Sequence, residues 1–223
     1  MKKQKFLFIW DFHGVLEKDN EYAVQHICRQ VTKEFGFNTK IYLEDVRRWY
    51  GLKWIEYFFN LTRETNRRTL GKMVERAREV SQEIVQKYLK PMNHADYVLS
   101  RIKKSGNVNI VISNARQDRI EDFVKIVGLQ KYLDEVVGVD GHIRFKSSTS
   151  AEKARAIGRL SVGKNYARKI MIGDSESDIL AGKIVGAKTY LFVTKMNRKK
   201  TGKIKADRTI SDLRKILPEI HTV

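Results

Sequence analysis

Short apolar runs alternate with helical segments along this chain, and this alternation restricts the fold more than any other feature. The runs are rich in Val, Ile and Phe, and each is cut off by Gly, Asp, Ser or Asn. Strands that alternate with helices build a parallel sheet covered by helices on both faces. The expected strands are 5–10, 107–113, 135–139, 168–173 and 188–193, and helices are expected at 117–128, 150–160 and 176–186.

One long gap interrupts the alternation. The stretch between the first two strands is far too long for a single crossover. From about Asn20 to Lys90 the pattern is helical, so we interpret this stretch as an all-helical insertion that closes near Lys90 and Pro91. Its aromatic residues at helical spacing are expected to form its own core, with a ligand cage as the alternative: Trp49, Trp54, Tyr57 and Phe58.

Polar side chains follow three of the expected strands. Asp11 comes after the first, Ser113 and Asn114 end the second, and Asp174 with Asp178 follows the fourth. Each alone is typical of a helix cap or a turn. In a doubly covered parallel sheet, however, ligands bind at the carboxyl ends of the strands, near the point where the strand order reverses. These side chains are therefore the candidates for a functional site.

A coherent chemistry unites these candidates. A carboxylate can attack phosphorus and form an aspartyl phosphate, which splits one difficult displacement into two. Because that attack brings two anions together, a divalent cation is needed, and Mg²⁺ prefers oxygen ligands such as Asp11, Asp174 and Asp178. The hydroxyl of Ser113, a backbone amide near Asn114 and a lysine would hold the phosphoryl oxygens.

The chain resembles the haloacid dehalogenase (HAD)-like hydrolase superfamily over most of 5–217. The motifs that carry the resemblance are DFHGVL (11–16), VISNA (111–115), Lys153 in AEKARAIGRL, and IGDSESD (172–178). The resemblance implies an α/β fold with a Rossmann-like parallel sheet core and an inserted all-helical cap domain. We expect the catalytic core to comprise 1–18 and 92–223, and the cap domain, where substrate choice should lie, to comprise 19–91.

The resemblance also implies roles for the metal-binding and nucleophilic residues. Asp11 would be the nucleophile and a ligand of Mg²⁺. The backbone carbonyl of His13 would be a second ligand, and Asp174 would bind the metal with Asp178 beside it.

The phosphate-binding residues follow from the same resemblance. Ser113 and Lys153 would bind phosphate, with Lys146 as the competing lysine. Lys153 is preferred because it opens the helix before IMIGD at a more usual distance.

His13 departs from the phosphatase pattern, in which an Asp at this position protonates the leaving oxygen and then activates water. Histidine can replace that acid and base, since its reference pKa is about 6.5. Two alternatives are a substrate with a good leaving group, or a different bond altogether. Nearby Glu17 is expected to be a solvated residue at the entry to the cap, with a substitute acid as its alternative.

The chain is strongly basic, with a net charge of +18. Its densest positive segment is TKMNRKKTGKIK (194–205), which follows the fifth strand. This segment is interpreted either as a mobile solvated loop or as a means of steering anionic substrates. It lacks the interleaved aromatics of a nucleic-acid clamp.

Other features of the sequence argue against a P-loop, a membrane span and an internal disulfide. GRLSVGKN (158–165) matches GxxxxGK, but Asn165 stands where a P-loop needs Ser or Thr, and the segment leads from a helix to a strand. No apolar run is long enough for a membrane span. A single cysteine, Cys28, excludes an internal disulfide, so a cytoplasmic location is expected.

We therefore expect a Mg²⁺-dependent phosphohydrolase that acts on a small phosphorylated metabolite through Asp11. The alternatives are a HAD-type hydrolase of another bond (haloacid dehalogenase or phosphonatase-like) and a weakly active HAD protein that binds nucleic acid. The sequence leaves the substrate and the oligomeric state open.

Overall fold

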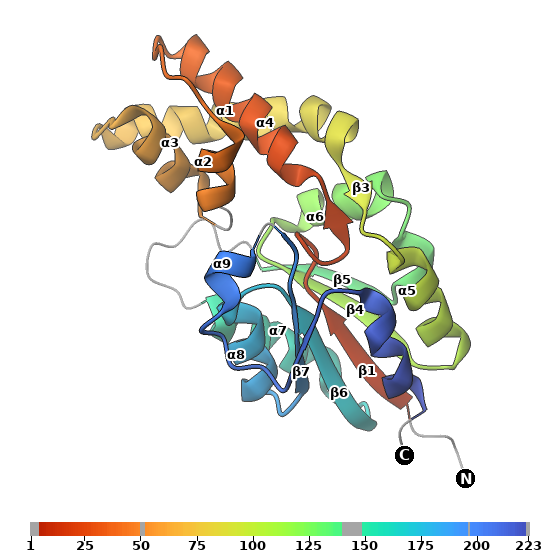
Figure 1. The fold of residues 1–223 in the computed structure, drawn as a ribbon. Coiled ribbons are helices and arrows are strands. Elements are labelled where there is room, and N and C mark those ends of the chain that lie inside the picture. The colour runs from red at the N-terminus through yellow and green to blue at the C-terminus, as the bar shows by residue number, and fades with distance from the viewer. Residues whose placement is uncertain (1–4, 50–51, 140–148, 196, 222–223) are drawn as a thin grey trace. The chain divides into compact units, whose positions relative to one another are not determined.

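The computed structural model describes residues 5–49, 52–139, 149–195 and 197–221. Contacts within the chain divide it into two compact units. One unit comprises Met1–Lys18 and Pro91–Val223 and contains the main sheet, and the other comprises Asp19–Lys90 and is helical. The chain leaves the sheet unit after its first strand and returns before its second, so the helical segment is an insertion (Figure 1).

In the described part of the chain, the main sheet has six parallel strands in the order β5-β4-β1-β6-β7-β8. They are β1 (Lys5–Trp10), β4 (Val108–Ser113), β5 (Glu135–Gly138), β6 (Tyr166–Gly173), β7 (Lys188–Phe192) and β8 (Arg208–Ile210). The five expected strands are confirmed, while β8 was not expected. Because β4 and β6 flank β1 on opposite sides, the strand order reverses at β1.

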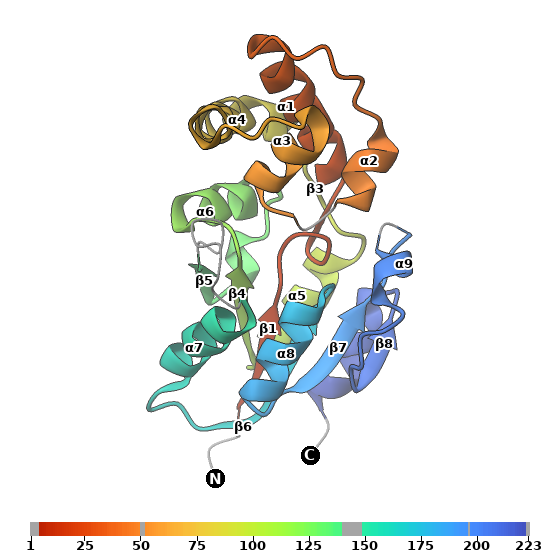
Figure 2. The same cartoon turned by 90° about the vertical axis from the view of Figure 1, so that its left-hand side faces the viewer.

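Helices cover both faces of this sheet. They are α5 (Ala95–Lys104), α6 (Gln117–Ile126), α7 (Thr149–Ser161) and α8 (Glu176–Ile184), with the 3₁₀ segments η1 (Gln130–Tyr132) and η2 (Leu213–Ile220). Helices α7 and α8 lie together on one face (Figure 2), whereas α5 and η2 lie on the other. A parallel sheet needs helices on both faces, and this sheet has them. The expected α/β class is therefore confirmed.

The side chains of β1 alternate between the two faces. Leu7 and Ile9 are buried in a cluster with Ala156 and Ile157 of α7. On the opposite face the Trp10 indole N–H donates to Asn109 Oδ1 at 3.1 Å. A strand that is buried on both sides reads as a continuous apolar run, which explains the sequence KFLFIW.

Over its described residues, the inserted unit has four helices and a core of its own. They are α1 (Asn20–Glu34), α2 (Leu43–Arg48), α3 (Trp54–Thr62) and α4 (Arg67–Tyr88). Tyr57 and Phe58 are buried in this core, and Trp49 and Trp54 pack against it, partly buried. These aromatic residues therefore form the core of the insertion, as expected from their helical spacing. The free thiol of Cys28 is buried in the same cluster.

Short elements complete the chain. The two-residue strands β2 (Glu17–Lys18) and β3 (Lys90–Pro91) pair where the chain enters and leaves the insertion. The helix α9 (Arg198–Thr201) lies within the basic segment. Residues 158–165 run from the end of α7 toward β6, which confirms that they form no P-loop. Among the described residues, no helix is both long enough and apolar enough to cross a membrane.

Candidate active site

Asp11 occupies the first position after the central strand β1. Its backbone N–H donates to the carbonyl of Ile172 at 2.9 Å, which continues the pairing of β1 with β6 by one residue. The side chain is only 7% exposed. Asp11 therefore stands at the carboxyl edge of the sheet, at the point where the strand order reverses and where ligands of such sheets bind.

Lys153 of α7 reaches this point from the neighbouring face of the sheet. Its ammonium donates to Asp11 Oδ1 at 2.7 Å and to Asp178 Oδ1 at 2.5 Å, and the side chain is fully buried. Burial acts to lower the pKa of Lys153, but the two carboxylates outweigh it and raise the pKa, so the ammonium stays charged. Lys146, the competing lysine, lies outside the described residues.

Asp178 lies in the first turn of α8 and is held in place by the start of that helix. Its Oδ2 accepts hydrogen bonds from the Ser175 backbone N–H at 3.1 Å and from the Ser175 hydroxyl at 2.5 Å. Together they form a capping box, which satisfies backbone donors that a helix N-terminus leaves free. This arrangement uses Oδ2 for the fold and leaves Oδ1 beside Lys153.

Three carboxylates converge at this edge of the sheet. Asp11, Asp174 and Asp178 each offer an oxygen, and these oxygens all lie within 4.8 Å of one another. Among the described residues, Lys153 is the ammonium that contacts this cluster, so the three carboxyl groups carry excess negative charge when all are ionised. The oxygen donors and the excess charge both fit a divalent cation such as Mg²⁺.

The pKa values reflect the same crowding. Burial raises the pKa of Asp11 to about 6, with Asp178 adding to the rise while Lys153 opposes it. Burial and the neighbouring Asp11 and Asp178 charges raise the pKa of Asp174 well above its usual value. Strongly perturbed carboxyl groups that share one site are typical of functional centres.

Ser113 and Asn114 end β4, the strand beside β1. Ser113 is buried, and its Oγ accepts the Ala115 backbone N–H at 3.2 Å, which leaves the hydroxyl proton available as a donor. The buried Oδ1 of Asn114 has no hydrogen-bond partner in the described part of the chain. Strand register brings both residues to the edge that carries Asp11, but no hydrogen bond between described residues joins them to the carboxylate cluster.

His13 and Glu17 contact each other on the loop after β1. His13 Nδ1 lies 3.0 Å from Glu17 Oε1, and the Glu17 side chain is completely buried. The expectation that Glu17 is a solvated residue is therefore wrong. A tight turn causes the difference, because the Phe12 carbonyl accepts backbone N–H groups from Val15, Leu16 and Glu17 and folds the loop inward.

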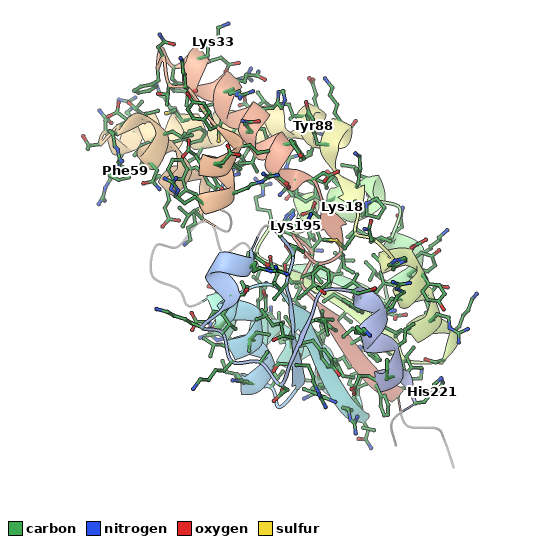
Figure 3. The ribbon with its side chains drawn as sticks, viewed as in Figure 1. Lys18, Lys33, Phe59, Tyr88, Lys195 and His221 are labelled. Carbon is green, nitrogen blue, oxygen red and sulfur yellow. The ribbon has the colours of Figure 1, made fainter. Side chains whose placement is uncertain are left out.

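Asn197 is a residue of this edge that the sequence analysis missed. It follows β7, is 4% exposed, and donates through Nδ2 to the carbonyls of Asp174 and Phe192 at 3.3 and 2.9 Å. It thereby ties the start of the basic segment to the loop that carries Asp174. The only signal in the sequence was a polar residue shortly after a strand end. Lys195, which is exposed, follows the same strand (Figure 3).

The fold and this cluster define an α/β protein with an acidic edge whose oxygens fit a divalent cation. A family model described as haloacid dehalogenase-like hydrolase matches residues 8–192, and the chain belongs to this family. The expected resemblance is confirmed.

Individual relatives are distant. Over 105 residues the chain is 32% identical to a phosphoglycolate phosphatase from Aquifex aeolicus, a match that covers 47% of each chain, so it spans about half of that relative.

Solved structures share the fold. A haloacid dehalogenase-like family hydrolase from Streptococcus pneumoniae is 15% identical, with a TM-score of 0.77, and the match covers 99% of this chain and 100% of that one. A predicted phosphoglycolate phosphatase from Haemophilus somnus is also 15% identical, with a TM-score of 0.78 and coverage of 98% and 99%.

Proposed function

We propose that this hydrolase is a Mg²⁺-dependent phosphatase that acts on a small phosphorylated metabolite through an aspartyl phosphate on Asp11. The observation that carries the proposal is the position of Asp11, whose Oδ1 accepts a hydrogen bond from Lys153 while Asp174 and Asp178 offer oxygens beside it. The phosphatase name of the Aquifex relative supports the same reaction class.

The proposed reaction has two displacements. An Asp11 carboxylate oxygen attacks phosphorus, and the bond from phosphorus to the leaving oxygen breaks as that oxygen takes a proton. Water then attacks the phosphorus of the aspartyl phosphate and loses a proton, which releases inorganic phosphate and restores the Asp11 carboxylate. We assign the transfer of both protons to His13, which stands two residues after Asp11.

The other residues of the edge would bind and orient the phosphoryl group. Lys153 supplies a buried positive charge, and the Ser113 hydroxyl and a backbone amide near Asn114 supply donors. Asp11, Asp174, Asp178 and the His13 carbonyl would hold Mg²⁺, which lowers the repulsion between the carboxylate and the phosphate when it is bound.

The acidic cluster favours phosphoryl transfer over cleavage of a carbon–halogen bond. Clustered carboxylates repel a departing halide, whereas a cation that they would hold attracts the phosphate of a substrate. The alternative, hydrolysis of a carbon–halogen bond, is tested by measuring chloride release from a haloacid alongside phosphate release from an aryl phosphate.

The test of the proposal is hydrolysis of an aryl phosphate by the wild-type chain and by Asp11→Asn. We expect Mg²⁺-dependent phosphate release, loss of nearly all activity in Asp11→Asn, and normal activity in the control Asp118→Asn, since Asp118 is an exposed residue at the start of α6. Mass spectrometry of the wild-type chain during turnover should detect one added phosphoryl group. Wild-type rates in folded Asp11→Asn would refute the proposal.

A further inference from the structure

Glu17 is a buried carboxyl group without a role in the proposed reaction. It is 0% exposed, its Oε1 accepts the Gly14 backbone N–H at 3.2 Å, and the same oxygen lies 3.0 Å from His13 Nδ1. Its Oε2 is buried without a hydrogen-bond partner among the described residues. Burying a carboxyl group with one oxygen unsatisfied is unfavourable. The hydrogen bond from Gly14 offsets part of this cost, and the remaining contact that Glu17 makes is the one with His13.

The hydrogen bonds around Glu17 favour a proton on Nδ1 of the imidazole. A backbone N–H can only donate, so the Gly14 contact makes Oε1 an acceptor. If Glu17 is ionised, both its oxygens accept. A protonated Glu17 that accepts both contacts through its carbonyl oxygen gives the same result: with Oε1 accepting, the nitrogen that faces it donates, so His13 Nδ1 carries a proton. The reverse arrangement, in which an Oε1–H donates to Nδ1, would leave Nδ1 unprotonated and is the result that would overturn the inference.

We infer that Glu17 is a positioning residue for His13, which it holds with Nδ1 protonated so that Nε2 is the nitrogen that serves the reaction. This inference rests on the proposed function only for the step in which His13 moves protons. In the described part of the chain Nε2 has no hydrogen-bond partner, and the His13 side chain is 29% exposed. Nε2 is therefore the ring nitrogen that the fold leaves free.

The surrounding loop holds the ring from several sides. Gly14 has φ +77°, a left-handed conformation that a residue with a side chain rarely adopts, and it turns the chain so that Glu17 returns to His13. The rings of Phe12 and Phe123 pack edge-on against the imidazole, each with a centroid distance of 5.3 Å. Only Glu17 among these neighbours distinguishes the two ring nitrogens, because the aromatic contacts are apolar.

The consequence for the reaction is a defined path for each proton. A proton on Nε2 passes to the leaving oxygen as the bond to phosphorus breaks, and Nε2 then takes a proton from the attacking water. Throughout, Nδ1–H stays bonded to Glu17. An imidazole without Glu17 could present either nitrogen in either protonation form, which would lower the fraction of molecules ready to react.

The first test uses the wild-type chain, labelled with ¹⁵N in its histidines. Long-range ¹H–¹⁵N correlation spectra distinguish a protonated ring nitrogen from an unprotonated one, and the His13 signals are assigned by their loss in His13→Ala. We expect a protonated Nδ1 at neutral pH. An unprotonated Nδ1 in the wild-type chain would overturn the inference, and this measurement needs neither a variant of Glu17 nor activity.

The second test compares Glu17→Leu with Glu17→Gln. The leucine removes the acceptor, so the His13 signals should shift, and turnover of an alkyl phosphate should fall at least about tenfold more than turnover of an aryl phosphate, whose leaving group needs no proton. Glu17→Gln keeps an acceptor oxygen, so its His13 signals and its relative turnover of alkyl and aryl phosphates should stay close to those of the wild type.

The same substitutions are then made in His13→Ala. There Glu17→Leu should have no further effect on either substrate, because Glu17 acts through His13. Equal losses on both substrates, or a full additional loss in the His13→Ala background, would overturn the inference. Activity in Asp11→Asn would instead refute the proposed function and leave the nitrogen assignment standing.

Discussion

Lys153 and Asp11 are 142 positions apart in the chain, yet the Lys153 ammonium donates to Asp11 Oδ1 at 2.7 Å in a buried site. The same ammonium also contacts Asp178, so one positive charge holds two carboxylates together. A buried ammonium is costly unless it is paired. The position of the Lys153 ammonium, at the edge of the sheet where ligands bind, indicates a role toward an anionic substrate.

Lys153→Met should therefore reduce kcat by about 10²–10³, since it removes a preorganised positive charge from the transition state. Without divalent cation the variant should also be less stable, because Asp11 and Asp178 then repel each other without compensation. Steady-state kinetics and thermal unfolding in EDTA measure the two effects. The control is Lys164→Met, which removes an exposed lysine after α7. An unchanged kcat in Lys153→Met would contradict the proposed role.

Mg²⁺ should stabilise the wild-type chain, and Asp174→Asn should abolish most of that effect. A cation that binds only the folded state at 100 times its Kd stabilises by about 2.7 kcal/mol, which raises Tm. In EDTA, by contrast, Asp174→Asn should be at least as stable as the wild type, because it relieves repulsion among three carboxylates. Thermal unfolding with and without Mg²⁺ measures both quantities.

Glu176→Gln is the matched control for Asp174→Asn. It lies in the same GDSESD segment, is exposed, and removes one negative charge in the same way. Its Tm should rise with Mg²⁺ as in the wild type. Equal responses of the two variants would show that Mg²⁺ acts through general charge rather than through the three clustered carboxylates.

Gly173→Ala should disrupt the site without a change of charge. A Cβ at residue 173 would overlap with the Cβ of Asp178, so the start of α8 would have to move. We expect loss of Mg²⁺-dependent stabilisation and of most activity. Gly158→Ala is the control, because no atom lies within 4 Å of its added Cβ and the residue is within α7, where Ala stabilises by about 0.5–1 kcal/mol relative to Gly. A fully active Gly173→Ala would argue against this tight packing.

The strands and the carboxylates that follow them could be predicted because both depend on local pattern. A buried parallel strand reads as an apolar run such as KFLFIW, and parallel strands bring their carboxyl ends to one edge. Asp11, Asp174 and Asp178 were therefore predictable as neighbours, and their oxygens do converge.

The burial of Glu17 and the role of Asn197 could not be predicted in this way. Glu17 is buried because three N–H groups share one carbonyl in a tight turn, and a glutamate after a strand carries no sign of that geometry. Asn197 contacts Asp174, which is 23 positions away and on a different loop. Short β8 was missed because RTI is too brief and too exposed for an apolar pattern.

Glu219 offers a test of stability that is separate from the site. Its carboxylate accepts hydrogen bonds from Lys188 at 2.6 Å, from Tyr190 at 2.5 Å and from Arg168 at 3.2 Å, which joins η2 to β6 and β7. Burial acts to raise the pKa of Glu219, but the bonds from Lys188 and Tyr190 outweigh it, so the pKa lies below its usual value. Ionised Glu219 is therefore favoured by the fold.

A lowered pKa in the folded state means that Glu219 contributes its stability above the unfolded-state pKa of about 4.3, and that the contribution is lost as pH falls through the lower folded-state pKa. Glu219→Gln should thus cost about 1–3 kcal/mol of unfolding free energy at pH 7, and clearly less at pH 3.5. Urea unfolding at both pH values measures the difference. Glu135→Gln, at an exposed position of β5, should change little at either pH. A cost for Glu219→Gln that is the same at both pH values would mean that the charge of Glu219 adds nothing to the joint between η2 and the sheet.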